Sequence, residues 1–215
     1  TLKVSKDTSD HTGGSENSKN RKEGIYYVQK ISDFYDSLYY SFPDTLVYYD
    51  WMTDDIHIRR FDFSEIKDTL IIPLIDYWHK YAHPVNGEVT SEFGTRRWRF
   101  HFGTDVDLET GDSVNNVFDG VVRVSTYSKS YGHVVVVRHH NGLETLYAHL
   151  SKRLVETDSV LYAGDVVGLG GNTGWSYGSH LHFETRFFDE SINPRDIIDF
   201  ENKQLLNDTL FLSAC

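Results

Sequence analysis

The sequence is poor in several features that would point to a particular class of protein. Its only cysteine is Cys215, so no disulfide can form within the chain, although this does not exclude an oxidising compartment. No apolar run approaches the ~20 residues that a membrane-spanning helix needs. Positive charge is scarce too, because 21 lysines and arginines face 32 aspartates and glutamates, a formal net charge of −11. Nucleic-acid binding requires clustered positive charge, so no nucleic-acid partner is expected.

Aromatic residues, by contrast, are abundant. The chain has 14 tyrosines and 13 phenylalanines, and 39% of its residues are hydrophobic. Stiff, flat side chains favour β-sheets, and this apolar content suffices for the core of one domain plus an extension. The sequence therefore predicts a mainly β protein, an antiparallel two-sheet sandwich or open barrel-like domain with a small mixed α/β extension on its N-terminal side.

Composition divides the chain into four parts. Residues 1–24 are mostly small, charged or polar, and predict a flexible lead, either a tether from a membrane anchor or a frayed terminus. Residues 25–81 form the predicted extension, which has no chemical motif of its own. Residues 82–200 hold every candidate site residue and form the main domain. Residues 201–215 are expected to pack on that domain as a tail.

Periodicity predicts two helices and one hairpin outside the centre of the main domain. Apolar residues at helical spacing predict a short helix over Ile31–Phe42. Asn193 is a suitable N-cap for a second short helix over 194–199, whose first residue is a proline. The runs Thr45–Trp51 and Ile56–Phe63 are rich in β-branched and aromatic residues and predict a hairpin in the extension.

The strongest hairpin signal lies in the main domain. Val134–His140 and Leu143–His149 are joined by Asn141-Gly142, the pair that suits a two-residue type I′ turn. This turn would place His140 opposite Leu143 and Val134 opposite His149. His149 would then lie at the far end of its strand, where a site can open.

The spacing of the eleven histidines singles out two clusters. The first is His180-Leu-His182. On a strand both rings point to the same face, with their Cα atoms about 7 Å apart. One ring can then bind a metal while the other leans over the open coordination position. Taken alone, the pair fits two surface histidines equally well.

A second cluster, His101-Phe-Gly-Thr-Asp105, supplies an imidazole and a carboxylate. A fully extended chain would hold them about 13 Å apart, but Gly103 lets the chain bend towards a common point. The two clusters together offer three ligands, as expected of a catalytic zinc with one open position. The sequence has no HExxH helix, so another architecture must supply the base.

Further motifs between Pro84 and Pro194 follow one another in a fixed order. They are Ser91-Glu-Phe-Gly-Thr-Arg96, His101-Phe-Gly-Thr-Asp105, Gly111-Asp-Ser-Val114, Asp119-Gly-Val-Val122, Tyr131-Gly132, His139-His-Asn-Gly142, Tyr147-Ala-His-Leu150, Gly164-Asp-Val-Val-Gly168, Gly174, Ser179-His-Leu-His-Phe-Glu184 and Asn193-Pro194. In this order they resemble the lysostaphin/LytM family of zinc peptidoglycan endopeptidases, peptidase family M23. The resemblance covers about half of the chain and does not extend into residues 1–80.

The resemblance implies roles for five residues. His101, Asp105 and His182 would bind Zn²⁺, and His149 and His180 would face the open side of the metal as catalytic residues. It implies a metalloendopeptidase that cuts peptide cross-links of peptidoglycan with a zinc-activated water, in an extracytoplasmic location. Of the two catalytic histidines, His180 is the one we expect to transfer the proton, although neither spacing nor family divides the roles.

Two other functions remain open at this stage. One is a non-catalytic wall-binding or amidase-activating protein on the same fold, which the intact ligand set disfavours. The other is a zinc peptidase for a peptide unrelated to cell wall. Residues 25–80 are also a candidate for covering the groove and holding the enzyme latent.

Several residues near these motifs have two interpretations each. Glu184 shares a strand face with His182 and would either orient it or form a surface salt bridge. Arginines at 96, 97 and 99 suit substrate carboxylates, but Arg96 fits a structural role better. His133 is a candidate for substrate contact. The aromatic candidates for groove walls are Tyr127, Tyr131, Trp175 and Tyr177.

Overall fold

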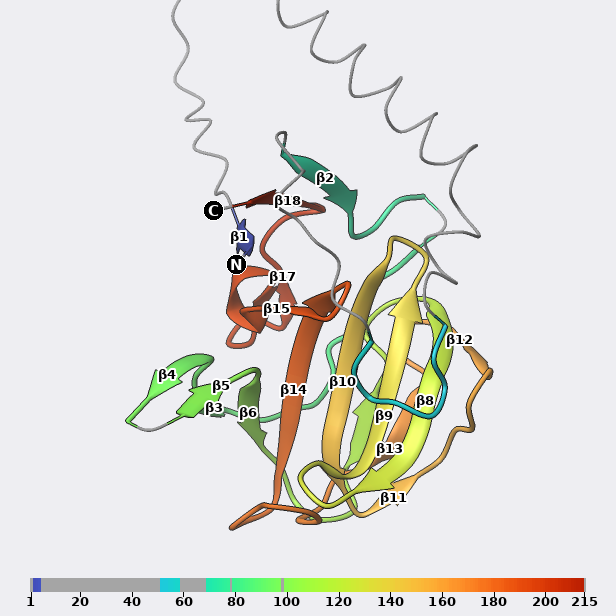
Figure 1. Ribbon diagram of the computed structural model, residues 1–215, viewed down its shortest axis with the longest axis vertical. Helices are drawn as coiled ribbons and strands as arrows, with labels where there is room; N and C mark the ends of the chain where they lie inside the picture. The colour runs from blue at the N-terminus through green and yellow to red at the C-terminus, as the bar shows by residue number, and fades with distance from the viewer. Residues whose placement is uncertain (1, 5–50, 59–68, 78, 98, 215) are drawn as a thin grey trace, which may run out of the picture.

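The computed structural model describes five stretches of the chain (Figure 1): residues 2–4, 51–58, 69–77, 79–97 and 99–214. The predicted lead and the helix over Ile31–Phe42 lie outside these stretches, apart from residues 2–4 of the lead. Strands dominate the described residues, which contain no α-helix and therefore none that would reach across a bilayer. The expected mainly β, antiparallel architecture is confirmed, whereas the α/β character of the extension stays a prediction.

The largest sheet is antiparallel and has the strand order β12-β8-β9-β10-β14-β6-β3, in which β15 also pairs with β14. Its strands are β3 (Val89–Ser91), β6 (Thr104–Asp107), β8 (Gly120–Ser128), β9 (Gly132–His139), β10 (Leu143–Leu150), β12 (Val160–Leu161), β14 (His180–Phe187) and β15 (Glu190–Ile192).

Four smaller sheets or hairpins surround it. β11, β13 and β7 form one three-stranded sheet, β1, β18 and β2 form another, and β16–β17 and β4–β5 are two-stranded. Their bounds are β1 (Leu2–Val4), β2 (Leu70–Pro73), β4 (Gly94–Arg96), β5 (Arg99–His101), β7 (Ser113–Asn115), β11 (Lys152–Arg153), β13 (Val166–Leu169), β16 (Ile198–Asp199), β17 (Gln204–Leu205) and β18 (Thr209–Ala214).

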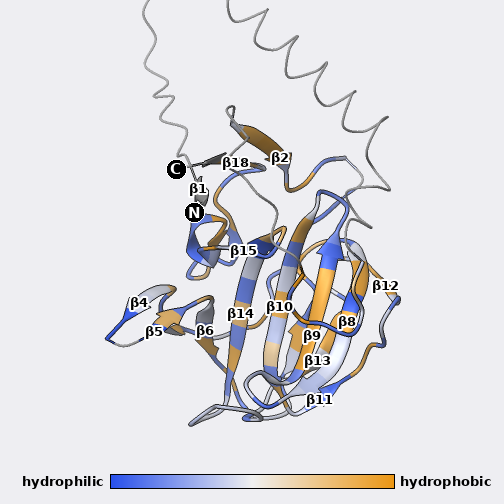
Figure 2. Ribbon diagram, viewed as in Figure 1, coloured by the Kyte–Doolittle hydropathy of each residue, from blue (hydrophilic) through white to orange (hydrophobic). Residues whose placement is uncertain are grey.

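The central strands of the large sheet are buried on both faces. On one face Val137, Tyr147 and Phe183 join the main core, which also contains Val114 of β7 and Val167 of β13. Side chains alternate between the faces of a strand, so this face lies between the large sheet and the β11-β13-β7 sheet. Figure 2 shows β9 as strongly hydrophobic, whereas β14 carries many polar residues.

The opposite face carries a smaller apolar cluster and a group of buried charges. Val136, Leu146 and Ala148 belong to the apolar cluster. Further along β9 and β10, the same alternation places Arg138 and Glu144 on this face. Their side chains are only 1% exposed and form an ion pair of 2.8 Å.

The segment 51–58, cyan in Figure 1, covers part of this second face. Arg123 of β8 donates hydrogen bonds to the carbonyl oxygens of Met52, Asp55 and Ile56, at 2.6, 2.7 and 2.9 Å. Because Arg123 is fully buried, the segment supplies acceptors that its guanidinium would otherwise lack. The expected strand over Ile56–Phe63 is wrong for its described residues 56–58, which form no strand.

The β9–β10 hairpin is present, but its turn differs from the prediction. Arg138 pairs with Glu144 rather than with Thr145, a shift of one residue. Gly142 donates its N–H to the carbonyl of His139 and alone adopts a left-handed conformation, with a φ of 83°. Three-residue connections of this kind need one left-handed residue, whereas a type I′ turn needs two. The prediction of a type I′ turn is therefore wrong.

The expected helix over 194–199 is shorter than predicted. Residues 194–196 form a single 3-10 turn, and residues 198–199 already belong to β16. The capping role of Asn193 is confirmed, because its side chain accepts a hydrogen bond from the backbone of Arg195. Pairing of β16 with β17 takes over the backbone groups that a longer helix would have used.

Candidate metal centre

Three side chains from three strands meet at one edge of the second face. His101 ends β5, Asp105 lies in β6, and His182 lies in β14, directly opposite Asp105 in the β6–β14 register. His101 Nε2 is 3.0 Å from both Asp105 Oδ1 and His182 Nδ1, and His182 Nδ1 is 2.8 Å from Asp105 Oδ1. The predicted ligand set is therefore brought together as expected.

Gly103 permits this arrangement by its lack of a side chain rather than by bending the chain. A Cβ atom at this position would lie 2.4 Å from the carbonyl oxygen of Phe183 and 2.9 Å from Cε1 of His182. The backbone between His101 and Asp105 therefore runs against β14 at a distance that only glycine allows.

Hydrogen bonds to the outer nitrogens fix which inner atoms carry lone pairs. His101 Nδ1 lies 2.7 Å from the carbonyl oxygen of Glu92, which can only accept, so this nitrogen carries the proton. His182 Nε2 lies 2.9 Å from Glu184 Oε1 and donates to that carboxylate. In their neutral form the two rings therefore turn lone pairs on His101 Nε2 and His182 Nδ1 towards each other and towards Asp105.

Three acceptors about 3 Å apart repel one another unless they share a cation, either a proton or a metal ion. The donor set, two imidazole nitrogens and one carboxylate oxygen, is that of catalytic zinc sites with an open fourth position. The pKa values of Asp105 and His182 also indicate that the site favours positive charge. Burial disfavours the charged form of Asp105, but the bonds from His101 and His182 lower its pKa well below the usual range. Burial likewise disfavours protonated His182, yet Asp105 and Glu184 raise its pKa to about 9.

Glu184 holds His182 from behind, so the orienting interpretation, and not the surface salt bridge, describes it. Glu184 is fully buried, and its Oε1 also accepts a 3.0 Å hydrogen bond from the hydroxyl of Tyr131. Its Oε2 accepts from Arg186 Nε at 2.7 Å and Nη2 at 2.6 Å. Arg186 in turn donates to the carbonyl of Ile56 at 3.1 Å. This chain links the metal centre to the segment 51–58, a connection that sequence reasoning missed because backbone carbonyls leave no motif.

Arg96 also acts on the ligand set, in line with the structural role favoured for it. Its Nη2 donates to Asp105 Oδ2 at 3.2 Å and to Ser91 Oγ. The same Nη2 lies 2.6 Å from His101 Nδ1, but that nitrogen already donates to the carbonyl of Glu92, so the contact is not a hydrogen bond. Arg96 therefore fixes the carboxylate whose other oxygen faces the two histidines.

His149 and His180 lie beside the three ligands. Their ring centroids are 4.8 Å apart, and the His149 ring is 5.8 Å from that of His182. His180 Nε2 is 3.7 Å from Asp105 Oδ1. His149 Nδ1 donates to the carbonyl of Thr173 at 2.7 Å, and His180 Nδ1 to that of Gly178 at 2.9 Å. In the neutral form each ring therefore keeps a lone pair on Nε2.

A bulge in β10 aims His149 at this site. The register with β9 shifts between Tyr147 and Leu150, and His149 adopts a φ of 60°. A left-handed conformation is uncommon for a residue other than glycine, and bulges of this kind redirect side chains near active sites. Burial lowers the pKa of His149 to about 4, so its ring is neutral at pH 7.

The aromatic candidates for groove walls separate into two groups. Tyr127, Trp175 and Tyr177 are exposed, by 56%, 75% and 101%. Tyr131 instead uses its hydroxyl on Glu184, so part of its role is structural. His133 packs edge-on against Tyr127, with ring centroids 5.0 Å apart.

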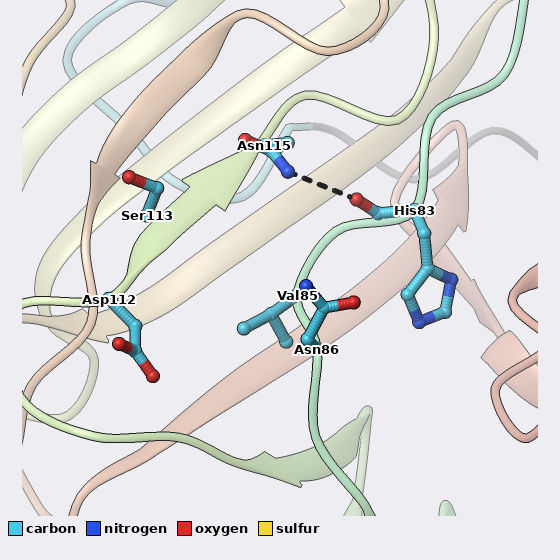
Figure 3. Close-up of a pocket in the computed structure, with 6 residues that line it drawn as sticks. All are labelled: His83, Val85, Asn86, Asp112, Ser113 and Asn115. Atoms are coloured by element: carbon cyan, nitrogen blue, oxygen red, sulfur yellow. Dashed lines mark hydrogen bonds between the residues drawn. The ribbon is translucent and has the colours of Figure 1, made fainter.

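Two other features of the described residues do not form part of this centre. Asp76, His79 and His140 offer ligand atoms within 4.8 Å of one another. However, the two rings stack 3.7 Å apart at 10°, so their in-plane lone pairs cannot both point at one ion. A cavity of about 250 Å³ (Figure 3) is lined by polar residues, none of which belongs to the metal centre: His83, Asn86, Asp112, Ser113 and Asn115, together with Val85.

Fold and site together define a β-sheet protein in which three side chains could hold one metal ion. Residues 99–194 match the family model "Peptidase family M23". This match confirms, for the main domain, the family resemblance found in the sequence.

Among similar proteins is the DD-carboxypeptidase/endopeptidase Mpg of Neisseria meningitidis serogroup B, 39% identical over 112 residues. The aligned part covers 49% of this chain and 26% of that protein, so the chain spans about a quarter of this relative's length. A zinc-containing peptidase from Vibrio cholerae is 30% identical, with a TM-score of 0.50, over 53% of this chain and 39% of the other. Lysostaphin from Staphylococcus simulans shares the fold, with 24% identity and a TM-score of 0.50 over 54% and 52% of the two chains.

Proposed function

We propose that this protein is a zinc-dependent endopeptidase that hydrolyses peptide cross-links of bacterial peptidoglycan. The observation that carries the proposal is that ligand atoms of His101, Asp105 and His182 lie within 4.8 Å of one another. The name of a relative from Vibrio cholerae, 36% identical over 115 residues, supports the substrate, because that protein is a peptidoglycan DD-endopeptidase. Peptidoglycan lies outside the cytoplasm, so we propose an extracytoplasmic location.

A zinc ion held by His101, Asp105 and His182 would supply a Lewis acid and lower the pKa of a coordinated water towards ~7. The chain's own residues then handle protons. His180 presents Nε2 next to the ligands, 3.7 Å from Asp105 Oδ1, and we assign it the transfer of the water proton to the leaving amine. His149 stays neutral and offers its Nε2 lone pair, which can hold a water or amine N–H in position.

The test is hydrolysis of purified peptidoglycan by the zinc-loaded protein, followed by mass spectrometry of the products. We expect new muropeptides, absent with His182→Ala or after a strong chelator, and restored to the chelated wild type by zinc. His79→Ala, a histidine outside this centre, is the matched control. Activity that survives both treatments would show that the metal assignment is wrong. Digestion of peptidoglycans with different cross-link chemistries, followed by mass spectrometry of the products, identifies the cleaved bond.

A protein without catalytic activity on the same fold is the competing hypothesis, and no feature of the site favours it. Metal analysis separates the two. The endopeptidase is expected to contain one zinc per chain, whereas a protein that lacks stoichiometric zinc and stays inactive after zinc addition would favour wall binding or activation of another enzyme.

A further inference from the structure

Most arginines in the described part of the chain are engaged by the protein itself. Each has a hydrogen bond or ion pair with a named partner: Arg96 with Asp105, Arg123 and Arg138 with Glu144, Arg153 with Ser125, Arg186 with Glu184, and Arg195 with Glu92. Arg97 and Arg99 are the exceptions. Both are exposed, and neither has an ion pair with another described residue.

These two arginines lie within four residues of the metal ligand His101, on the β4–β5 hairpin. Figure 1 shows this hairpin projecting from the body of the molecule beside β6. The chain as a whole carries a net charge of −11, which on average disfavours the approach of anions. Cations left free beside the metal centre are therefore unusual for this protein.

The register of the hairpin distinguishes Arg99 from Arg97. Arg96 pairs with Arg99, and residues paired across two strands share a face. The guanidinium of Arg96 reaches Asp105, so that face is turned to the metal ligands. Arg99 is also two residues from His101 on the same strand, about 7 Å away and on the same face. Arg97 lies in the turn instead.

The opposite face of the hairpin is aromatic. Phe100 packs against Phe93 and Phe102, with ring centroids 5.0 and 5.1 Å apart. These contacts support the strand that carries Arg99. A guanidinium on such a support can grip a carboxylate with two parallel hydrogen bonds.

We propose that Arg99 forms a carboxylate-binding subsite beside the metal centre. This inference rests on the proposed function. Arg99 lies two residues before the metal ligand His101 on β5. The ligand of the subsite is therefore a free carboxylate on a peptide residue next to the scissile bond. The subsite makes the protein selective for cross-links whose neighbouring carboxylate is free rather than amidated.

The experiment uses two synthetic cross-linked peptides that differ only in this group, a free carboxylate or its carboxamide. For the zinc-loaded wild type we expect kcat/KM to be roughly tenfold higher for the free acid, the effect of one charge-assisted hydrogen bond. Arg99→Gln is expected to bring the ratio to about one. Arg99→Lys keeps the charge but loses the two-point grip, so its ratio should fall between them. Arg97→Gln is the matched control and should keep the wild-type ratio.

If the wild type cuts both peptides at the same measurable rate, or if Arg99→Gln keeps the wild-type preference, the proposal is overturned. Calorimetric binding of both peptides to zinc-loaded His180→Ala, with and without Arg99→Gln, separates the two levels of inference. If the wild type cuts neither peptide but the acid still binds more tightly through Arg99, the endopeptidase proposal fails and the subsite stands. Equal binding of both peptides contradicts the subsite.

Discussion

Replacing Glu184 by glutamine tests whether the buried carboxylate controls the metal centre. Glu184 accepts the Nε2–H of His182 and so keeps the Nδ1 lone pair directed at His101 and Asp105. Glutamine has nearly the same shape but no charge, and its amide can turn an N–H towards the ring. Removal of such a partner of a ligating histidine lowers metal affinity 10–100-fold, about 1.4–2.7 kcal/mol.

The same change also costs stability, because Arg186 loses the counter-ion that it contacts through Nε and Nη2. Both partners are buried, and breaking such a pair costs about 3–5 kcal/mol. Glu144→Gln is the matched control. Glu144 is equally buried and pairs with Arg123 and Arg138, but it has no hydrogen bond to a metal ligand.

The assay measures zinc affinity by competition with a chromogenic chelator and the free energy of unfolding of the zinc-free protein by urea denaturation. We expect both variants to lose stability by similar amounts, while only Glu184→Gln loses zinc affinity. An unchanged zinc affinity in Glu184→Gln, or an equal loss in both variants, would refute the reasoning.

Three further predictions concern other residues. His180→Ala should lower kcat about 10²–10⁴-fold with one zinc per chain retained, since His180 is not a ligand; loss of zinc by metal analysis would contradict its role. Gly103→Ala should abolish zinc binding, whereas Gly178→Ala, whose Cβ meets nothing within 4 Å, should not, as measured by the same chelator competition. Burial lowers the pKa of His139 to about 3, so between pH 6.5 and about 3 the unfolded chain binds the extra proton. Stability should fall with decreasing pH there, by about 1.4 kcal/mol per pH unit from this group. His139→Gln should flatten that slope, and an unchanged slope in urea titrations would argue against a buried neutral ring.

Local pattern was sufficient to predict the mainly β fold, the β9–β10 hairpin and the capping role of Asn193. These features depend on alternation and on the preferences of single residues, which are written directly in the sequence. The turn type was not predictable in the same way. An Asn-Gly pair fits a type I′ turn, but the packing of the two strands set a register in which only Gly142 is left-handed.

The chain by itself determined the ligand types: the His-x-His pair and the His-x-x-x-Asp cluster contain every donor of the metal centre. Only the tertiary structure decided what surrounds them. The partners of Glu184 come from positions 131 and 186, Arg186 is held by a carbonyl of the segment 51–58, and Arg99 is distinguished from Arg97 by cross-strand register. Contacts of this kind join residues far apart in the chain through backbone atoms or through a shared strand face. They produce no characteristic spacing of residues that could be recognised in the sequence.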